Sequence, residues 1–156
     1  TVQVARDAGF VEEVLLDDAA KSEFELELLP GQYFWRVRDS SSVYSEPQSV
    51  TVRPYPPISV SVAHEKLQLE LSWSPVDPVD SYRVRIARDA SYAKVVFNES
   101  VNQPEMSVAV PGYGSYFAEI VTITNGVESE AKTIEFRVER ELSRWLLALF
   151  AIPLLF

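Results

Sequence analysis

Two neighbouring runs in the middle of the chain, residues 67–73 and 82–86, alternate apolar and polar side chains at every position. Strict alternation is typical of strands that bury one face and expose the other. The residues between the runs, 74–80, contain two prolines and two aspartates, which favour a corner between strands. The pattern therefore predicts two strands and a corner, with Trp73 and Tyr82 in the core.

The same alternation recurs in short runs on both sides of this stretch. The predicted strands are 2–4, 11–16, 24–28, 33–37, 50–52, 58–62, 67–73, 82–86, 95–97, 106–110, 116–123 and 133–138. Turn residues separate them, among them Pro30-Gly31, Pro111-Gly112 and Asn125-Gly126. Many short strands at a spacing of roughly ten residues are typical of a β-sandwich.

A proline-rich segment, residues 54–57, interrupts the strand pattern. Prolines cannot donate ladder hydrogen bonds and favour a stiff, extended chain, so we expect a domain boundary here. The predicted organisation is a partial repeat over 1–53, a linker over 54–57, a complete domain over 58–140 and an apolar tail over 141–156.

The first and second parts of the chain are an internal repeat. Residues 4–10 match residues 86–92, and further matches, including Ser45-Glu46 with Ser129-Glu130, follow 81 to 84 positions apart in the same order. The first repeat therefore begins where the second has reached its third strand. We expect residues 1–53 to lack counterparts of the strands at 58–62 and 67–73.

Composition narrows the classes of function. The formal net charge of −9 argues against nucleic-acid binding, because phosphates require a basic surface. The absence of cysteine excludes disulfides, cysteine-ligated metals and thiol nucleophiles. The chain opens inside a strand pattern and without methionine, as expected of a piece of a longer polypeptide or a processed product.

The polar side chains predict no catalytic, metal-binding or cofactor-binding residue. His64, the single histidine, has no recognisable nucleophile to serve and is expected to be an exposed turn residue. The carboxylate groups lack the spacing of a calcium loop and are interpreted as solvated turn or edge charges. They are Glu12, Glu13, Asp17, Asp18, Asp77 and Asp80, with Glu23, Glu25 and Glu27 along the outer face of a strand.

Aromatic residues leave a sugar-binding platform as a weaker alternative. The candidates are Tyr33, Phe34, Trp35, Tyr44, Tyr55, Tyr113 and Phe117. Alternation places Tyr33 and Trp35 on one face of a strand, so Phe34 and its counterpart Phe117 are the expected exposed rings. Packing in the core or between domains is the favoured interpretation of these residues.

The C-terminal tail no longer alternates. Residues 145–156 are uncharged, and a helix of this length would span roughly 18 Å of the ~30 Å hydrocarbon core of a bilayer. Three interpretations stay open: the first half of a transmembrane helix, an interfacial or partner-buried anchor, and a segment folded against the protein itself. The predicted membrane or partner contacts are Trp145, Leu146, Leu147, Leu149, Phe150 and Ile152.

The motifs around the central corner resemble those of fibronectin type III domains. Trp73 and Tyr82 resemble the tryptophan and tyrosine of the second and third strands of that family. Pro111-Gly112 followed by Tyr116, and Pro30-Gly31 followed by Tyr33, resemble its turn and tyrosine corner. The amino-acid sequence of residues 82–92 is similar to that of repeats in bacterial envelope proteins, some of which follow a FecR-type domain.

This resemblance implies an all-β fold of tandem immunoglobulin-like sandwiches, the first lacking its early strands, with an apolar helical tail. The expected core residues are Trp73, Tyr82, Tyr116, Tyr33 and Trp35. The family carries no catalytic residue and no cofactor, so an enzyme is not expected.

The expected function is a spacer or protein-interaction module of a bacterial envelope protein. It would lie in the periplasm or outside the cell, bind a protein partner and be tethered to the membrane through its tail. One alternative is the ectodomain of a membrane sensor or receptor. A second is an ancillary domain of a carbohydrate-active or cell-wall enzyme.

Overall fold

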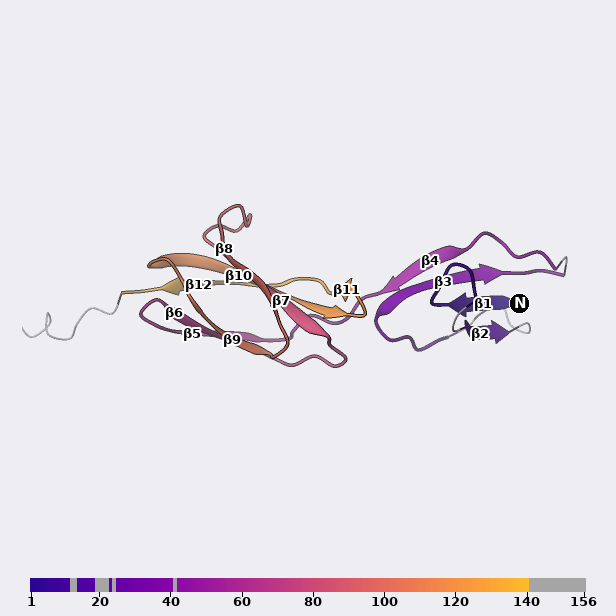
Figure 1. Cartoon of the computed structure of the whole chain (residues 1–156), viewed down its shortest axis with the longest axis horizontal. Helices are drawn as coiled ribbons and strands as arrows, with labels where there is room; N and C mark the ends of the chain where they lie inside the picture. The colour runs from indigo at the N-terminus through magenta and orange to yellow at the C-terminus, as the bar shows by residue number, and fades with distance from the viewer. Residues whose placement is uncertain (12–13, 19–22, 24, 41, 141–156) are drawn as a thin grey trace, which may run out of the picture.

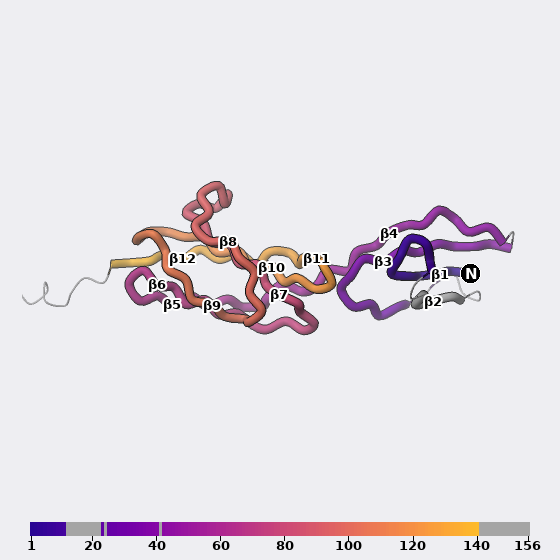
Figure 2. Tube along the Cα trace, in the orientation of Figure 1, coloured from indigo at the N-terminus to yellow at the C-terminus, as the bar shows by residue number. Residues whose placement is uncertain are grey.

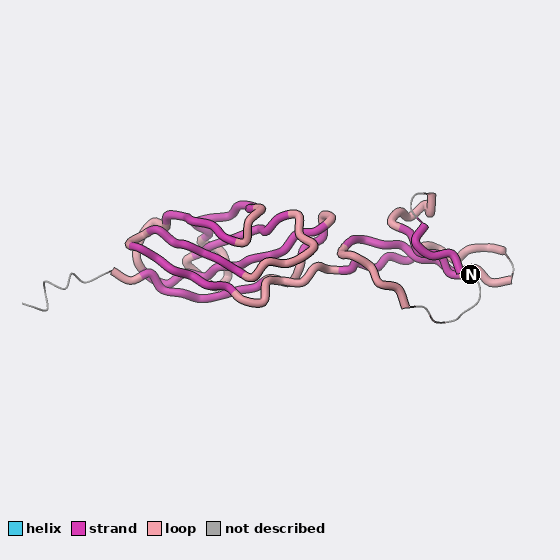
Figure 3. The backbone as a smooth tube through the Cα atoms, turned by 90° about the horizontal axis from the view of Figure 1, so that it is seen from below, coloured by secondary structure: helices cyan, strands magenta, loops and turns pink. Residues whose placement is uncertain are grey.

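The computed structural model describes residues 1–11, 14–18, 23, 25–40 and 42–140, and this part of the chain contains strands but no helix (Figure 3). The prediction of an all-β fold is confirmed for these residues. The predicted helix in the tail lies outside them. The strands form two units that follow each other along the long axis of the molecule, with residues 53–59 passing between them (Figure 1).

The first unit is a single antiparallel sheet. Its strands are β1 (Val2–Ala5), β2 (Val14–Asp18), β3 (Gly31–Val37) and β4 (Gln48–Val52), in the order β2-β1-β3-β4. Strands β1 and β3 lie at its centre and pair from Val2 with Val37 to Ala5 with Phe34. The tube in Figure 2 shows β3 and β4 running side by side in this sheet.

The second unit is a two-layer sandwich. One layer has the order β5-β6-β9, and the other has the order β8-β7-β10, with both β11 and β12 paired to β10. The strands are β5 (Val60–Glu65), β6 (Gln68–Trp73), β7 (Ser81–Ala87), β8 (Val95–Val101), β9 (Glu105–Ala109), β10 (Gly114–Thr124), β11 (Val127–Glu128) and β12 (Lys132–Val138). Asn125 and Gly126, both with positive φ, form the predicted turn between β10 and β11.

The core of the sandwich lies between its two layers. Leu69, Leu71 and Trp73 of β6 point inward, as the alternation predicts, and are buried. Tyr82 and Tyr116 contribute buried rings from the opposite layer. The rings of Trp73 and Tyr82 meet edge to face with centroids 5.3 Å apart, a favoured aromatic geometry. Two large rings from different layers therefore hold the sheets in contact.

The two units share one sheet plan. The order β2-β1-β3-β4 corresponds to β8-β7-β10-β12, and the pair Gly31–Val52 corresponds to Gly114–Val138. Both carry a tyrosine corner: Tyr33 donates its hydroxyl hydrogen to the carbonyl of Leu29 at 2.7 Å, and Tyr116 donates to Gly112 at 2.5 Å. The first unit therefore corresponds to the larger layer of the second, without a facing three-stranded layer among the described residues.

Two predictions for the first unit are wrong. Residues 25–29 form no strand, although the segment 24–28 alternates; Phe24 itself lies outside the described residues. Trp35 was expected in the core, but 38% of its surface is exposed. Both differences have one cause, because a strand needs a neighbour for its ladder and an apolar face needs a second layer to bury it. Tyr33 is buried nonetheless.

We predict that Tyr116→Phe lowers the free energy of unfolding of the second unit by about 1–2 kcal/mol, because the partly buried carbonyl of Gly112 loses its donor. Urea unfolding followed by the fluorescence of Trp73, with the other two tryptophans replaced by phenylalanine, measures the change. The control is Tyr113→Phe, which alters a more exposed tyrosine in the same turn. Equal stability of the two variants would contradict the role of the corner.

Candidate functional site

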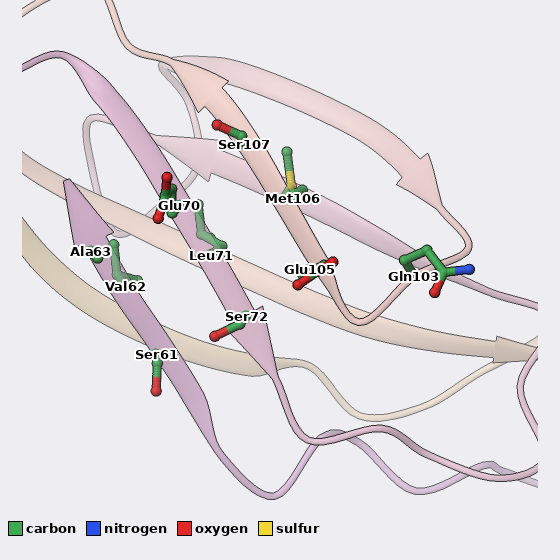
Figure 4. A pocket seen from close by; sticks show the side chains of 10 residues that line it. All are labelled: Ser61, Val62, Ala63, Glu70, Leu71, Ser72, Gln103, Glu105, Met106 and Ser107. Carbon is green, nitrogen blue, oxygen red and sulfur yellow. The ribbon is translucent and has the colours of Figure 1, made fainter. Parts of the chain in front are cut away.

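The outer face of the three-stranded layer forms a shallow hollow. Ser61 lies opposite Ser72 across β5 and β6, and Glu70 lies opposite Ser107 across β6 and β9 (Figure 4). Glu105 adds a second carboxylate on β9, next to Ser72. These short and acidic side chains suit hydrogen bonds to a polar or basic segment of a protein partner. Among the described residues, no group of three or more His, Cys, Asp or Glu side chains is placed to hold a metal ion.

His64 does not lie in an exposed turn, so that prediction is wrong. It belongs to β5, pairs with Leu69 of β6 and is half-buried. The turn begins two residues later at Lys66, whose φ of 56° closes the hairpin. The Nδ1 atom of His64 is buried without a hydrogen-bond partner. This position makes His64 a residue of the strand rather than of a loop-borne site.

A second hollow lies beside the proline-rich segment. It is lined by Tyr55, Pro56, Pro57, Ile58, Pro75, Val76, Asp77 and Lys132. The rings of Pro54 and Pro57 are buried, whereas the side chain of Tyr55 is 82% exposed. Asp77 lines this largely apolar hollow. Asp80, in the same corner, accepts a hydrogen bond from the backbone N–H of Asn125 at 2.6 Å. The hydrogen bond of Asp80 stabilises a turn, which agrees with the interpretation of this residue as a turn carboxylate and not as a metal ligand.

Two side-chain interactions bridge the units at this junction. Asn125 donates from Nδ2 to the carbonyl oxygen of Pro30 at 2.9 Å. Arg53 forms an ion pair with Glu130 at 2.8 Å, and both side chains are largely exposed. An exposed ion pair contributes at most about 1 kcal/mol, and the Asn125 hydrogen bond is exposed as well, so the buried rings of Pro54 and Pro57 are the firmer elements of the junction. Alternation along the strands gave no indication of these contacts, because they join turns and strand ends.

The outer face of the first unit carries rings that are covered by arginine. The guanidinium carbon of Arg36 lies 4.0 Å from the ring centroid of Phe10 and 4.0 Å from that of Tyr44. Arg36 also donates from Nε to Gln3 at 2.9 Å. Phe34 is half-buried rather than exposed. This arrangement stabilises the loops through cation–π contacts and leaves no open stack of rings here for a sugar.

On the equivalent face of the second unit, an arginine again packs over an aromatic ring, but the residues differ. Arg85 lies 4.6 Å from the ring centroid of Tyr92 and binds both carboxylate oxygens of Glu119, at 3.1 and 3.0 Å. Burial, helped by the charge of Glu119, raises the pKa of Tyr92. Phe117 is half-buried as well. Sequence reasoning missed both arginine sites, although their signal is present: the repeat aligns Gln3 and Arg36 with Arg85 and Glu119.

Each ring belongs to a loop that an aspartate organises. Asp7 accepts the backbone N–H of Gly9 at 2.9 Å, and Asp89 accepts those of Ala93 and Lys94 at 3.0 and 2.7 Å. These bonds hold Phe10 and Tyr92 at φ values of 55° and 56°. The repeated Ala-Arg-Asp sequence thus encodes a repeated loop conformation. Its role here is structural.

The inner face of the first sheet is an apolar surface without a covering layer among the described residues. Its exposed side chains include Trp35, Val37 and Val50. The predicted contacts in the tail, Trp145, Leu146, Leu147, Leu149, Phe150 and Ile152, lie outside the described residues, as do Glu12 and Glu13. Within the described part, no helix is long and apolar enough to cross a membrane.

Comparisons with known proteins identify the fold. The structure superposes on a segment of two fibronectin type III domains from chicken tenascin with a TM-score of 0.52 and 18% sequence identity, covering 70% of this chain and 66% of that one. Domains d3–d4 of the extracellular region of rat CD45 give a TM-score of 0.52 with 10% identity, covering 79% of this chain and 74% of that one. The fold is therefore of the fibronectin type III kind.

At the level of sequence, no family model matches the chain. A protein of Treponema pallidum (strain Nichols), itself described only as uncharacterized, is 28% identical over 127 residues. The match covers 72% of this chain and 19% of that protein, so the chain spans about a fifth of its relative's length.

We predict that the pKa of Asp89 lies below its ordinary value and that Ser91→Ala raises it. The hydroxyl of Ser91 donates to Asp89 at 2.5 Å and is the largest cause of the lowered pKa, ahead of the backbone N–H donors. Because the folded pKa is the lower one, the loop gains stability above the pKa of the unfolded chain, and this gain is lost as the pH falls through the folded value. Titration of the Asp89 carboxyl group by NMR measures its pKa in the parent protein and in the variant. An unchanged pKa in the variant would contradict this account.

Proposed function

We propose that the protein is a non-catalytic, extracytoplasmic module that separates and presents other parts of a bacterial envelope protein. The observation that carries the proposal is the junction between the two units. The buried rings of Pro54 and Pro57 and the hydrogen bond from Asn125 to Pro30 support a connection that restricts how one unit follows the other. Two β-units joined end to end by a stiff connection extend along one axis, which is the geometry of a spacer (Figure 1).

Protein binding is the second part of the proposal. The hollow on the outer face of β5, β6 and β9 offers Glu70 and Glu105 among small side chains, so a polar or basic strand or loop can approach the sheet closely (Figure 4). Charges of this kind at a rim affect the association rate and the choice of partner more than the affinity. The periplasmic or extracellular location is proposed from the sequence resemblance to envelope repeats, including those that follow a FecR-type domain.

We predict that replacing both junction prolines, Pro54→Gly and Pro57→Gly, widens the distribution of distances between the units, because glycine frees φ and removes buried rings. The chain contains no cysteine, so spin labels attach only at introduced sites. Val43→Cys and Ser100→Cys place one label in each unit at exposed positions. Pulsed electron–electron double resonance then gives the distribution of distances between the two labels.

The matched control for this experiment is Pro47→Gly, which changes an exposed proline within the first unit. We expect it to keep the narrow distribution of the parent chain. A parent distribution as broad as that of the double glycine variant would rule out the stiff junction and, with it, the spacer.

Membrane tethering is proposed to reside in the tail. We predict that the full chain floats with vesicles of phosphatidylethanolamine and phosphatidylglycerol in a density gradient, whereas a chain ending at residue 144 stays at the bottom. The reason is that residues 145–156 offer an uncharged apolar segment with a tryptophan at its start. A variant with Leu146, Leu147 and Leu149 replaced by serine keeps the length and should lose flotation. Flotation of all three chains would place the membrane contact elsewhere.

A further inference from the structure

The inner face of the sheet β2-β1-β3-β4 is built as a core face but is not buried as one. Val4 pairs with Trp35, Val2 with Val37 and Tyr33 with Val50, so these six side chains share one face. Trp35 is 38%, Val37 42% and Val50 43% exposed. An apolar face of this kind is a binding surface or a source of aggregation unless something covers it.

The second unit shows how the same face looks when it is covered. Its equivalent positions include Val84, Ile86, Tyr116 and Ala118, all of which are fully buried. The layer β5-β6-β9 faces them (Figure 1). Its side chains Leu69, Leu71 and Trp73 of β6 belong to the same buried core. The chain therefore contains its own template for the missing layer.

A second feature of the first unit matches this template. In the second unit, β9 precedes the tyrosine corner and pairs with β6, with Leu69 opposite Val108. In the first unit, residues 25–29 also precede a tyrosine corner but form no ladder, and Leu26 and Leu29 are exposed. A segment in this position that has no ladder partner is what strand addition would complete.

We propose that this open face and residues 25–29 bind an antiparallel β-hairpin of the same polypeptide, located on the N-terminal side of β1. The hairpin would supply the two strands that correspond to β5 and β6, and residues 25–29 would become the third strand of the layer. The first unit would then be a complete two-layer domain. The inference is independent of the proposed spacer role.

The topology of the second unit supports a hairpin in the same polypeptide. There, β5 and β6 come before β7, and the corner 74–80 crosses from one layer to the other. In the first unit, Thr1 and Arg38 exchange backbone hydrogen bonds of 2.8 Å, so the pairing of β1 with β3 extends up to Thr1. A crossing of the same kind would lead from this point onto the open face. The match covers only 19% of the Treponema pallidum relative, so similar sequence occurs there within a longer polypeptide.

The chemistry of the expected hairpin follows from the surface it meets. Its inward positions would be large and apolar, with an aromatic residue in the place of Trp73. Glu25 and Glu27 are exposed along the segment that the hairpin would pair with. Lysine or arginine at outward positions of the adjacent strand would form cross-strand pairs with these carboxylates.

Cysteine labelling tests the proposal. Val37→Cys and Val50→Cys place single thiols on the open face of a chain that has no other cysteine. We expect maleimide labelling of both variants to be at least tenfold slower in the complete polypeptide of the reading frame than in residues 1–156. The control is Val43→Cys, which lies in the loop before β4, is 71% exposed and should react equally fast in both.

Hydrogen exchange on the unsubstituted proteins gives a second readout that does not depend on the variants. We expect the amides of residues 25–29 to be protected only in the complete polypeptide. Equal labelling and equal exchange in both proteins would overturn the proposal. Slow labelling of residues 1–156 that depends on concentration, with a dimer in light scattering, would assign the face to a second copy. Labelling of the complete polypeptide that slows only after adding another protein would assign it to a partner.

Discussion

Burial of one apolar sheet face against a second layer is the constraint on which the rest of this structure depends. In the second unit, β5, β6 and β9 cover the larger sheet, and the contact of Trp73 with Tyr82 sits where the layers meet. The turns, the tyrosine corner and the arginine-covered loops are arranged around this closed core. In the first unit the same turns and corner are present around a sheet whose face is open. Local motifs therefore persist when the second layer is absent, whereas burial does not.

Alternation predicted most strands because it reports directly which side chains of a strand prefer a buried face. It predicted Trp73 and Tyr82 as core residues, the family resemblance added Tyr116 and Tyr33, and all four side chains are buried. Alternation cannot report whether a second layer exists, and for this reason the prediction that Trp35 lies in the core was wrong. The strand expected at 24–28 failed for the same reason.

The remaining misses concern backbone conformation and contacts between loops. The hairpin turns at Lys66, which has a positive φ. A lysine gives no strong sequence signal for this conformation, so the turn was predicted too early and included His64. The contact of Asn125 with Pro30 joins turns of two repeats that are far apart in the chain. A hydrophobic pattern carries no information about such contacts. The repeat does carry information on the arginine sites, although sequence reasoning missed them, because it aligns Gln3 and Arg36 with Arg85 and Glu119.

The two arginine sites have a consequence for folding. Tandem repeats with the same sheet plan can exchange strands and misassemble. If β3 replaced β10 beside β7, Arg36 would lie opposite Arg85 in place of Glu119, so an ion pair would become a repulsion between like charges. In the reciprocal exchange, Glu119 would face Gln3 and lose its arginine. The difference between the two repeats at this one pair of positions thus acts against mispairing and helps each strand to find its own sheet.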